Sequence, residues 1–262
     1  MSRYLISLRR FWGTALAGQL EYQANILIDL VAMVGSLAGS IFVLSLFYEQ
    51  GRELGGWSWQ AALVVQGFYT LLDGMASTWL RPNLGAIVTH VREGTLDYVL
   101  LKPIDSQFWL SLRTLAPAGL PEMALGVALI VWAAAQAGAS FSMGSILLAL
   151  LMLLSGGCIL YALWFVIAAT SIWFVKTWNA TEVLRAALAA GRFPVSAYPP
   201  TLRLMFTFIF PVAFLTTVPA EAILGRSAIS IVVLGLLLAS LFLAVSRMFW
   251  HFALRHYTSA SS

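Results

Sequence analysis

The stretch SILLALLMLLSGGCILYALWFVIAATSIWFV, residues 145–175, contains no charged side chain. A helix of about 20 apolar residues is long enough to cross the hydrocarbon core of a bilayer. The whole chain shares this character: its 262 residues are 60% hydrophobic and 10% charged, with a mean hydropathy of +0.87. Soluble domains carry roughly 25% charged residues. The sequence therefore predicts an all-α integral membrane protein.

Apolar segments on both sides of this stretch predict further crossings. With it they make six transmembrane helices, within Ile26–Phe47, Gln60–Leu80, Leu115–Ala137, Ser145–Val175, Leu204–Val218 and Ala228–Phe252. The fifth is short and is broken by Pro211, with Pro219 and Glu221 close behind. A proline at membrane depth frees backbone groups that neighbours or water must satisfy. We expect a short helix with a re-entrant turn there; a kinked crossing is the alternative.

The basic residues divide unevenly among the connections. With the N-terminus inside, the cytoplasmic pieces are residues 1–25, 81–115, 176–203 and those after 246. These pieces hold 13 of the 15 Lys and Arg residues, and only Arg52 and Arg226 fall outside them. An excess of Lys and Arg in cytoplasmic loops is the usual orientation signal of membrane proteins. It predicts that both termini are cytoplasmic. Anionic lipid headgroups explain the net charge of +4 better than nucleic acid does.

The first 25 residues are too polar for a crossing but are amphipathic. We expect an N-terminal helix that lies in the cytoplasmic interface, and a frayed start of the first span is the alternative. Its apolar positions recur at helical spacing: Leu5, Leu8, Trp12, Leu16 and Leu20.

The loop after the second predicted span reads RPNLGAIVTHVREGTLDYVLLKPID, residues 81–105. Its first part has apolar residues at i, i+3, i+4 and i+7, which predicts a short amphipathic helix that Gly94 can end. A second apolar patch, 96–101, is closed by Lys102 and Pro103. Periodicity alone fits equally well a loop on the membrane and a surface offered to a cytosolic protein. The four apolar residues of the helix are Leu84, Ile87, Val88 and Val91.

Ionisable residues within the predicted spans are functional candidates, because charge inside a bilayer is costly. Asp73 lies near the middle of the second span and Glu122 lies just inside the third. If the substrate is a cation, these two carboxylates are candidate contacts in its pathway. A polar bond between helices is the alternative, and we interpret Asp29 as a snorkelling carboxylate.

The chain carries no catalytic or metal-binding motif that we recognise. Its one cysteine, Cys158, lies in an apolar run, and its three histidines do not have the spacing of metal ligands. The nucleotide-binding pattern G-x-x-x-x-G-K-[ST] and the metalloprotease pattern H-E-x-x-H are both absent. We therefore expect neither an enzyme nor a metal site or bound cofactor.

Residues 92–103, REGTLDYVLLKP, resemble the R-x-G-x-L-D-x-x-L-L-x-P signature of ABC-2 type transporter permeases. The chain is similar to the branch described as viologen-exporter-type permeases, and the likeness covers essentially its whole length. It implies a single ABC-2 transmembrane domain over residues 1–262, with a fold like that of type V exporters. Further matches are EYQAN at 21–25, LDG at 72–74, RPN at 81–83, RFP at 192–194 and PVAF at 211–214.

The resemblance also implies partners. Two permeases from different genes would pair as a heterodimer in the bacterial inner membrane, with a homodimer as the alternative. A cytosolic ABC ATPase dimer would bind the ATP and Mg. The loop at 81–105 would be the coupling helix that docks on the ATPase. Leu84, Ile87, Val88 and Val91 would seat it. The charged residues Arg92, Glu93 and Asp97 would orient it by charge-assisted hydrogen bonds.

The function that follows is export by alternating access of a hydrophobic or amphiphilic substrate, such as a drug-like cation. Export of a lipid-linked glycan or polysaccharide is the alternative. A secondary transporter would show paired interrupted spans, whereas only one span here is clearly broken. An intramembrane protease is disfavoured because its motif is missing.

Overall fold

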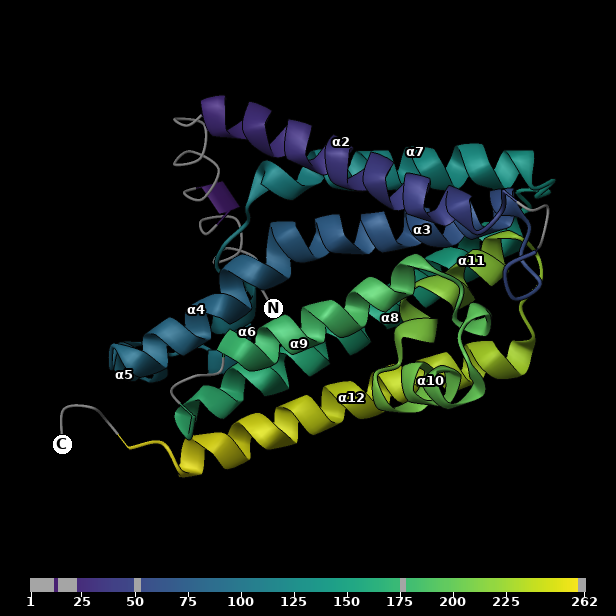
Figure 1. The fold of residues 1–262 in the computed structure, drawn as a ribbon. Helices are drawn as coiled ribbons and strands as arrows, with labels where there is room; N and C mark the ends of the chain where they lie inside the picture. Colours follow the sequence, from purple (N-terminus) through teal and green to yellow (C-terminus); the bar gives the residue numbers. More distant parts are fainter. Residues whose placement is uncertain (1–11, 14–22, 50–52, 175–177, 259–262) are drawn as a thin grey trace.

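The structure is a computed structural model that describes residues 12–13, 23–49, 53–174 and 178–258. Long helices lie side by side in a bundle, and short helices gather near its two ends (Figure 1). In the described part of the chain, the one β-type pairing is an isolated bridge between Leu54 and Trp57. The α-helices are α2 (Gln23–Leu46), α3 (Trp59–Met75), α4 (Arg81–Arg92), α5 (Leu96–Leu100), α6 (Ser106–Leu112), α7 (Leu120–Gln136), α8 (Met143–Ala169), α9 (Trp178–Ala189), α10 (Pro200–Leu204), α11 (Val218–Ile223) and α12 (Ile229–Arg255).

Among the described residues, three helices are long and apolar enough to cross a bilayer. They are Pro117–Gln136, Met143–Ile172 and Ile229–Arg255. A fourth candidate is the pair Pro200–Ile209 and Ala213–Ile223, which is bent by 77° at the short break that contains Pro211. The expected break in this region is therefore present. Within the described residues, length and composition support three or four crossings, and the total of six stays a prediction.

Helices α3 and α7 pack closely, and glycine makes this contact possible. A Cβ atom on Gly126 of α7 would lie 2.5 Å from the backbone nitrogen of Leu71. A Cβ atom on Gly74 of α3 would lie 2.7 Å from the backbone nitrogen of Met123. The two backbones therefore touch, as in membrane helix pairs that associate through small residues.

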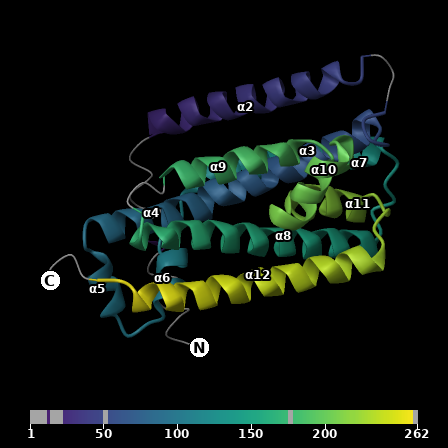
Figure 2. The same cartoon turned by 60° about the horizontal axis from the view of Figure 1, so that its bottom comes forward.

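On the other side of the bundle, α8 is sandwiched between α11 and α12 (Figure 2). The buried rings of Phe165 and Trp250 meet edge to face at 5.4 Å between α8 and α12. A Cβ atom on Gly156 would lie 2.9 Å from the carbonyl oxygen of Phe214, so the chain before α11 also approaches α8 closely. These contacts hold the bent segment inside the bundle.

Polar bonds attach α6 to α8 and α12. Asp105 caps α6 by accepting from the amide of Phe108 at 2.8 Å, and it pairs with Arg247 of α12 at 2.6 Å. Gln107 donates to the hydroxyl of Tyr161 on α8 at 3.1 Å. Burial raises the pKa of the Asp105 carboxyl, but the bonds from Arg247 and Phe108 outweigh burial, so its pKa lies below its ordinary value. Asp105 is therefore ionised near neutral pH.

Residues 178–203, which belong to the connection predicted as cytoplasmic at 176–203, do not stay at one end of the bundle. The turn at the end of α8 packs against α4 at one end of the bundle, and α9 then runs back beside α8. At the opposite end, ahead of α3, the Ser196 hydroxyl donates to the carbonyl oxygen of Gly55 at 2.9 Å. Gly55 has a φ of +62°, and a Cβ there would lie 2.6 Å from Ala197 N, so the site needs glycine.

This difference from a single loop has a physical cause. Charge counting assigned Arg185, Arg192 and Arg203 to a loop, because arginine inside a membrane is rare. In the structure, Arg185 and Arg192 belong to the segment that runs along the bundle. Arg203 lies near the Gly55 end, where it donates to the carbonyl oxygen of Ser196 at 2.6 Å. The bent pair Pro200–Ile209 and Ala213–Ile223 follows from that end.

The expected N-terminal interfacial helix lies almost wholly outside the described residues. Of its apolar positions, Trp12 is described. Its indole Nε1 donates to the carbonyl oxygen of Leu112 at 3.2 Å, and its ring meets Trp79 edge to face at 6.3 Å. These contacts place Trp12 against the α4 and α6 region.

Candidate functional sites

A cavity of about 370 Å³ lies between α3, α8, α9 and the bent segment. Its charged lining consists of Asp73, Arg81, Arg185 and Arg192. Apolar walls come from α8 and from the segment around Leu215. Charged groups are costly at membrane depth and mark functional positions there. The cavity is therefore the first candidate site.

Asp73 and Arg81 lie on one continuous helix and form an ion pair through Asp73 Oδ1 and Arg81 Nη2. The helix passes from α3 to α4 through a π-helical turn, Ala76–Leu80. Such turns inside α-helices are frequent at functional sites. A second guanidinium nitrogen, Nη1 of Arg81, donates to the hydroxyl of Ser77 at 2.8 Å. Asp73 is thus held by a cation of its own chain.

Glu122, the second predicted carboxylate, joins the same cluster from α7. Its Oε2 lies 3.4 Å from the hydroxyl of Ser77. A smaller cavity of about 260 Å³ borders Ser77, Arg81 and Glu122 on the side that faces α2. The structure therefore brings together the two carboxylates proposed for a substrate pathway. The side chain of Asp29 lies outside the described residues.

The arginines of the cavity were not foreseen as site residues. Arg192 holds its guanidinium 4.9 Å from the ring centre of Tyr69, with Nη2 3.4 Å from the Tyr69 hydroxyl. Arg185 precedes Arg192 by seven residues, a spacing that puts both on one helix face. Recurrence of arginine at that spacing in an otherwise apolar segment is the signal that sequence reasoning passed over.

Electrostatics distinguish this cavity from a cation site. Among the described residues, three guanidiniums and one carboxylate line it, and that carboxylate is paired with Arg81. Opposite charges within a few ångströms in a low-dielectric setting hold each other strongly. Asp73 is therefore poorly placed to receive a cationic substrate, and the positive excess lies with the arginines.

The second candidate site is the tip of the bundle formed by α4 and α5. The expected amphipathic helix is present as α4, and Gly94 follows it with a φ of +69°, as expected for a terminator. Leu84 and Ile87 are 0% exposed. They face their own chain, so the structure gives them a different role from the expected contact with a partner. Val88 and Val91 are half-buried.

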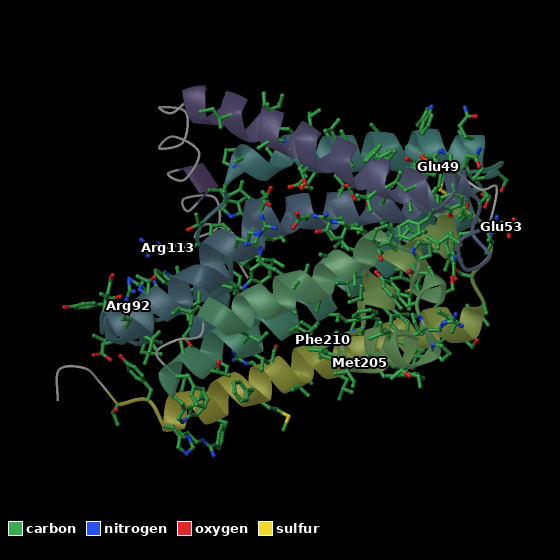
Figure 3. The ribbon with its side chains drawn as sticks, in the orientation of Figure 1. Glu49, Glu53, Arg92, Arg113, Met205 and Phe210 are labelled. Atoms are coloured by element: carbon green, nitrogen blue, oxygen red, sulfur yellow. The ribbon has the colours of Figure 1, made fainter. Side chains whose placement is uncertain are left out.

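The exposed part of the tip lies on α5 and on the turns before and after it. Tyr98 is 70% and Leu101 is 81% exposed, whereas Leu96 and Val99 of the same patch are buried. The predicted patch therefore has an inner and an outer face. Arg92 and Glu93 are exposed and 3.9 Å apart, and Asp97 is half-buried. Figure 3 shows Arg92 at this tip, with Glu49 and Glu53 at the opposite end.

Hydrogen bonds of two polar residues, Asn83 and His90, stabilise the tip. Asn83 is buried, donates to the carbonyl oxygens of Trp79 and Thr114 at 2.7 Å, and accepts from the Thr114 amide at 2.8 Å. His90 lies 2.7 Å from the Thr95 hydroxyl through Nδ1. Burial and the nearby Arg113 lower the pKa of His90 below its ordinary value, so its ring is neutral near pH 7. The tip is thus a braced surface.

Long apolar helices, a cavity between them that is lined by charged side chains, and an amphipathic tip are features of a multi-pass membrane protein. The family model for the ABC-2 family transporter protein matches residues 34–261. The chain therefore belongs to the ABC-2 family, and the resemblance carried by residues 92–103 is confirmed. No curated protein and no solved structure matches the chain. It is thus a permease of an ABC transporter, and its family works with an ABC ATPase.

Proposed function

We propose that the chain is the membrane subunit of an ATP-driven exporter in the bacterial inner membrane, with both termini in the cytoplasm. Two permeases and two cytosolic ATPase subunits form the transporter, and ATP and Mg bind to the ATPases. The α4–α5 tip receives the movement of the ATPase, and the arginine-lined cavity receives the substrate. Family membership and the geometry of these two sites support the proposal.

Six crossings fit this arrangement, with α9 in place of the predicted fifth span. They are α2, α3, α7, α8, α9 and α12, and the bent pair Pro200–Ile209 and Ala213–Ile223 is a re-entrant segment at the outer end. At about 1.5 Å per residue, the 24 residues of α2 extend about 36 Å, enough for a hydrocarbon core of about 30 Å. The contact between Ser196 and Gly55 supports the outer position of the chain after α9.

One observation carries the coupling mechanism: a single uninterrupted helix runs from Trp59 to Arg92. It holds Asp73 in the cavity and ends at the exposed tip. Arg81, the partner of Asp73, is the first residue of α4. A tilt of α4 under the ATPase therefore moves the arginine against the carboxylate, which links ATP binding to the shape of the cavity.

The tip offers suitable chemistry for a partner. Tyr98 and Leu101 form an exposed apolar surface, and Arg92 and Glu93 border it with both signs of charge. Docking sites commonly combine an apolar centre with a polar rim. Leu84 and Ile87 support this surface from beneath, and Val88, Val91 and Asp97 lie at its margin. In this proposal, Tyr98 and Leu101 contact the ATPase, whereas Leu84 and Ile87 hold that surface in place.

Substitution of Leu101 by Asp tests the docking surface. We expect Leu101→Asp to abolish co-purification of the ATPase, because a carboxylate in an apolar contact costs several kcal/mol unless it is paired. Met143→Asp is the matched control, since Met143 is 72% exposed and begins α8 at the far end. Val88→Asp tests the margin. A Leu101→Asp variant that keeps a stoichiometric ATPase and full transport would contradict the assignment.

The second permease is expected to lie beside α2. Figure 2 shows α2 at the edge of the bundle, separated from most other helices. Its outward face is apolar and exposed at Val31, Val34 and Phe42. Cysteine cross-linking along this face distinguishes a homodimer from a heterodimer. In a homodimer, two copies of this chain cross-link when no other permease is present; in a heterodimer, cross-linking requires the second permease.

The substrate is an amphiphile in this proposal. A third cavity, of about 350 Å³, has an almost wholly apolar lining that includes Met75, Trp79 and Cys158. It shares Leu72 and Leu160 with the arginine-lined cavity. A charged chamber next to an apolar one suits a molecule with a polar head and an apolar body. Between the two substrate classes expected from sequence, the arginines favour the lipid-linked glycan over the drug-like cation.

A further inference from the structure

Three buried polar atoms in the arginine-lined cavity have no hydrogen-bond partner among the described residues. They are Nε of Arg81, Nε of Arg192 and the hydroxyl oxygen of Thr216. All three residues line the same cavity. Buried polar groups in proteins are normally paired, because an unpaired one carries a desolvation cost. Three residues that line one cavity therefore each carry a donor that the described residues leave unpaired.

The chemistry of the three atoms specifies the ligand. Each guanidinium Nε carries an N–H donor, and a hydroxyl can donate as well. Thr216 is 2% exposed, so bulk water does not satisfy it. Several convergent donors, two of them cationic, match an acceptor with several oxygens and negative charge. Arginine is the side chain best suited to bind phosphate and carboxylate groups.

We propose that this cavity binds the oxyanion headgroup of the transported amphiphile, with phosphate as the model group. The inference rests on the proposed transport function and names the substrate class of that site. Arg192 and Thr216 donate directly to the oxyanion, and Arg81 does so while it stays paired with Asp73. The apolar body of the substrate extends past Leu72 and Leu160 into the neighbouring apolar cavity.

A cation fits the same space poorly. Asp73, the one carboxylate in its described lining, is engaged by Arg81, and the face of Tyr69 is covered by Arg192. The two groups that would attract a cation are therefore occupied by arginines. Glu122 borders the adjacent smaller cavities instead.

Binding to the purified full-length permease in uncharged detergent tests the inference without the ATPase. The probes are dodecyl phosphate, dodecyltrimethylammonium and inorganic phosphate, and native mass spectrometry measures the bound fraction. We expect dodecyl phosphate to bind at least about tenfold more tightly than dodecyltrimethylammonium. Arg192→Gln should weaken that binding about tenfold, the scale of one charge-assisted hydrogen bond. Arg192→Lys should retain more of it.

Arg226→Gln is the matched control, because Arg226 stacks on Trp57 at 5.9 Å, away from the cavity. Its binding should equal that of the unchanged protein. Thr216→Val removes only a hydroxyl and carries the test if Arg192→Gln does not yield folded protein. If inorganic phosphate binds as tightly as dodecyl phosphate and is weakened equally by Arg192→Gln, the site is assigned to a free oxyanion. That result would still support binding of an oxyanion by these arginines.

Two results overturn the inference. One is equal binding of the cationic and anionic amphiphiles. The other is dodecyl phosphate binding that neither Arg192→Gln nor Thr216→Val changes. Failure of the proposed transport function gives a different result from failure of this inference. In that case the protein binds dodecyl phosphate but does not associate with an ABC ATPase.

Discussion

The contact between α3 and α7 yields a quantitative prediction for Gly126→Ala. The new Cβ would lie 2.5 Å from Leu71 N and 2.8 Å from Leu71 Cα, and these are backbone atoms that cannot rotate away. Ordinary contacts of a Cβ begin near 3.4 Å. The two helices must therefore separate by about 0.9 Å (3.4 minus 2.5), which loosens the packing along their length.

The energetic size of this change follows from a control in the same chain. Gly157 of α8 has no atom within 4 Å of its Cβ position, so Gly157→Ala meets open space. Both variants gain the same helix propensity, about 1 kcal/mol at most. Overpacking adds a cost of about 1–3 kcal/mol that applies to Gly126→Ala alone. The difference between the two variants therefore isolates the helix contact.

Reversible unfolding in mixed micelles measures that difference. Increasing mole fractions of a denaturing detergent unfold the protein, and tryptophan fluorescence reports the transition. We expect Gly126→Ala to be less stable than Gly157→Ala by about 1–3 kcal/mol, which is tenfold or more in the unfolding equilibrium at the middle of that range. Equal stability of the two variants would refute the close contact. It would also contradict the position of Glu122 beside Ser77, because that position depends on the close packing of α7 against α3.

The polar braces of the tip and of α6 give further predictions. Asn83→Ala leaves two carbonyls and the amide of Thr114 without their partner, so we expect unfolding in the same assay to become easier by about 1–3 kcal/mol; unchanged stability would argue against the brace. Asp105→Asn breaks the partly exposed pair with Arg247, and we expect a loss of at most about 1 kcal/mol. Because the pKa of Asp105 lies below its ordinary value of 3.8, its contribution is present above that pH and is lost as the pH falls through its folded-state pKa. The free energy of unfolding, measured from pH 7 to 3, should show this loss in the unchanged protein. If Asp105→Asn shows the same loss, groups other than Asp105 cause it. The pKa of His90 is lowered from 6.5, so acidification below that value should destabilise the tip, and His90→Gln should reduce this pH dependence.

Hydropathy and periodicity predicted those helices whose formation depends only on their own residues. The stretch at 145–175 became α8, the last apolar segment became α12, and the break at Pro211 is a 77° bend. In each of these the residues themselves determine the outcome: apolar side chains favour lipid, and proline cannot continue a helix. The amphipathic pattern of α4 was visible for the same reason.

Periodicity could not show what covers an apolar face. Leu84 and Ile87 have the same pattern whether they meet a partner or their own chain, and the structure buries both within the chain. Charge counting failed for α9 because it treats every arginine as solvated. An arginine can lie along the bundle when an aromatic ring receives it, as Tyr69 receives Arg192.

The sequence alone thus determined that the protein is helical, lies in a membrane and belongs among the ABC-2 permeases, because these properties depend on composition and on short motifs. Only the tertiary structure decided which charges meet. Asp73, Arg81, Arg192 and Thr216 come from three separate parts of the chain. Their sharing of one cavity depends on the path of α9 along the bundle and on the 77° bend at Pro211, and no local pattern encodes where either segment packs.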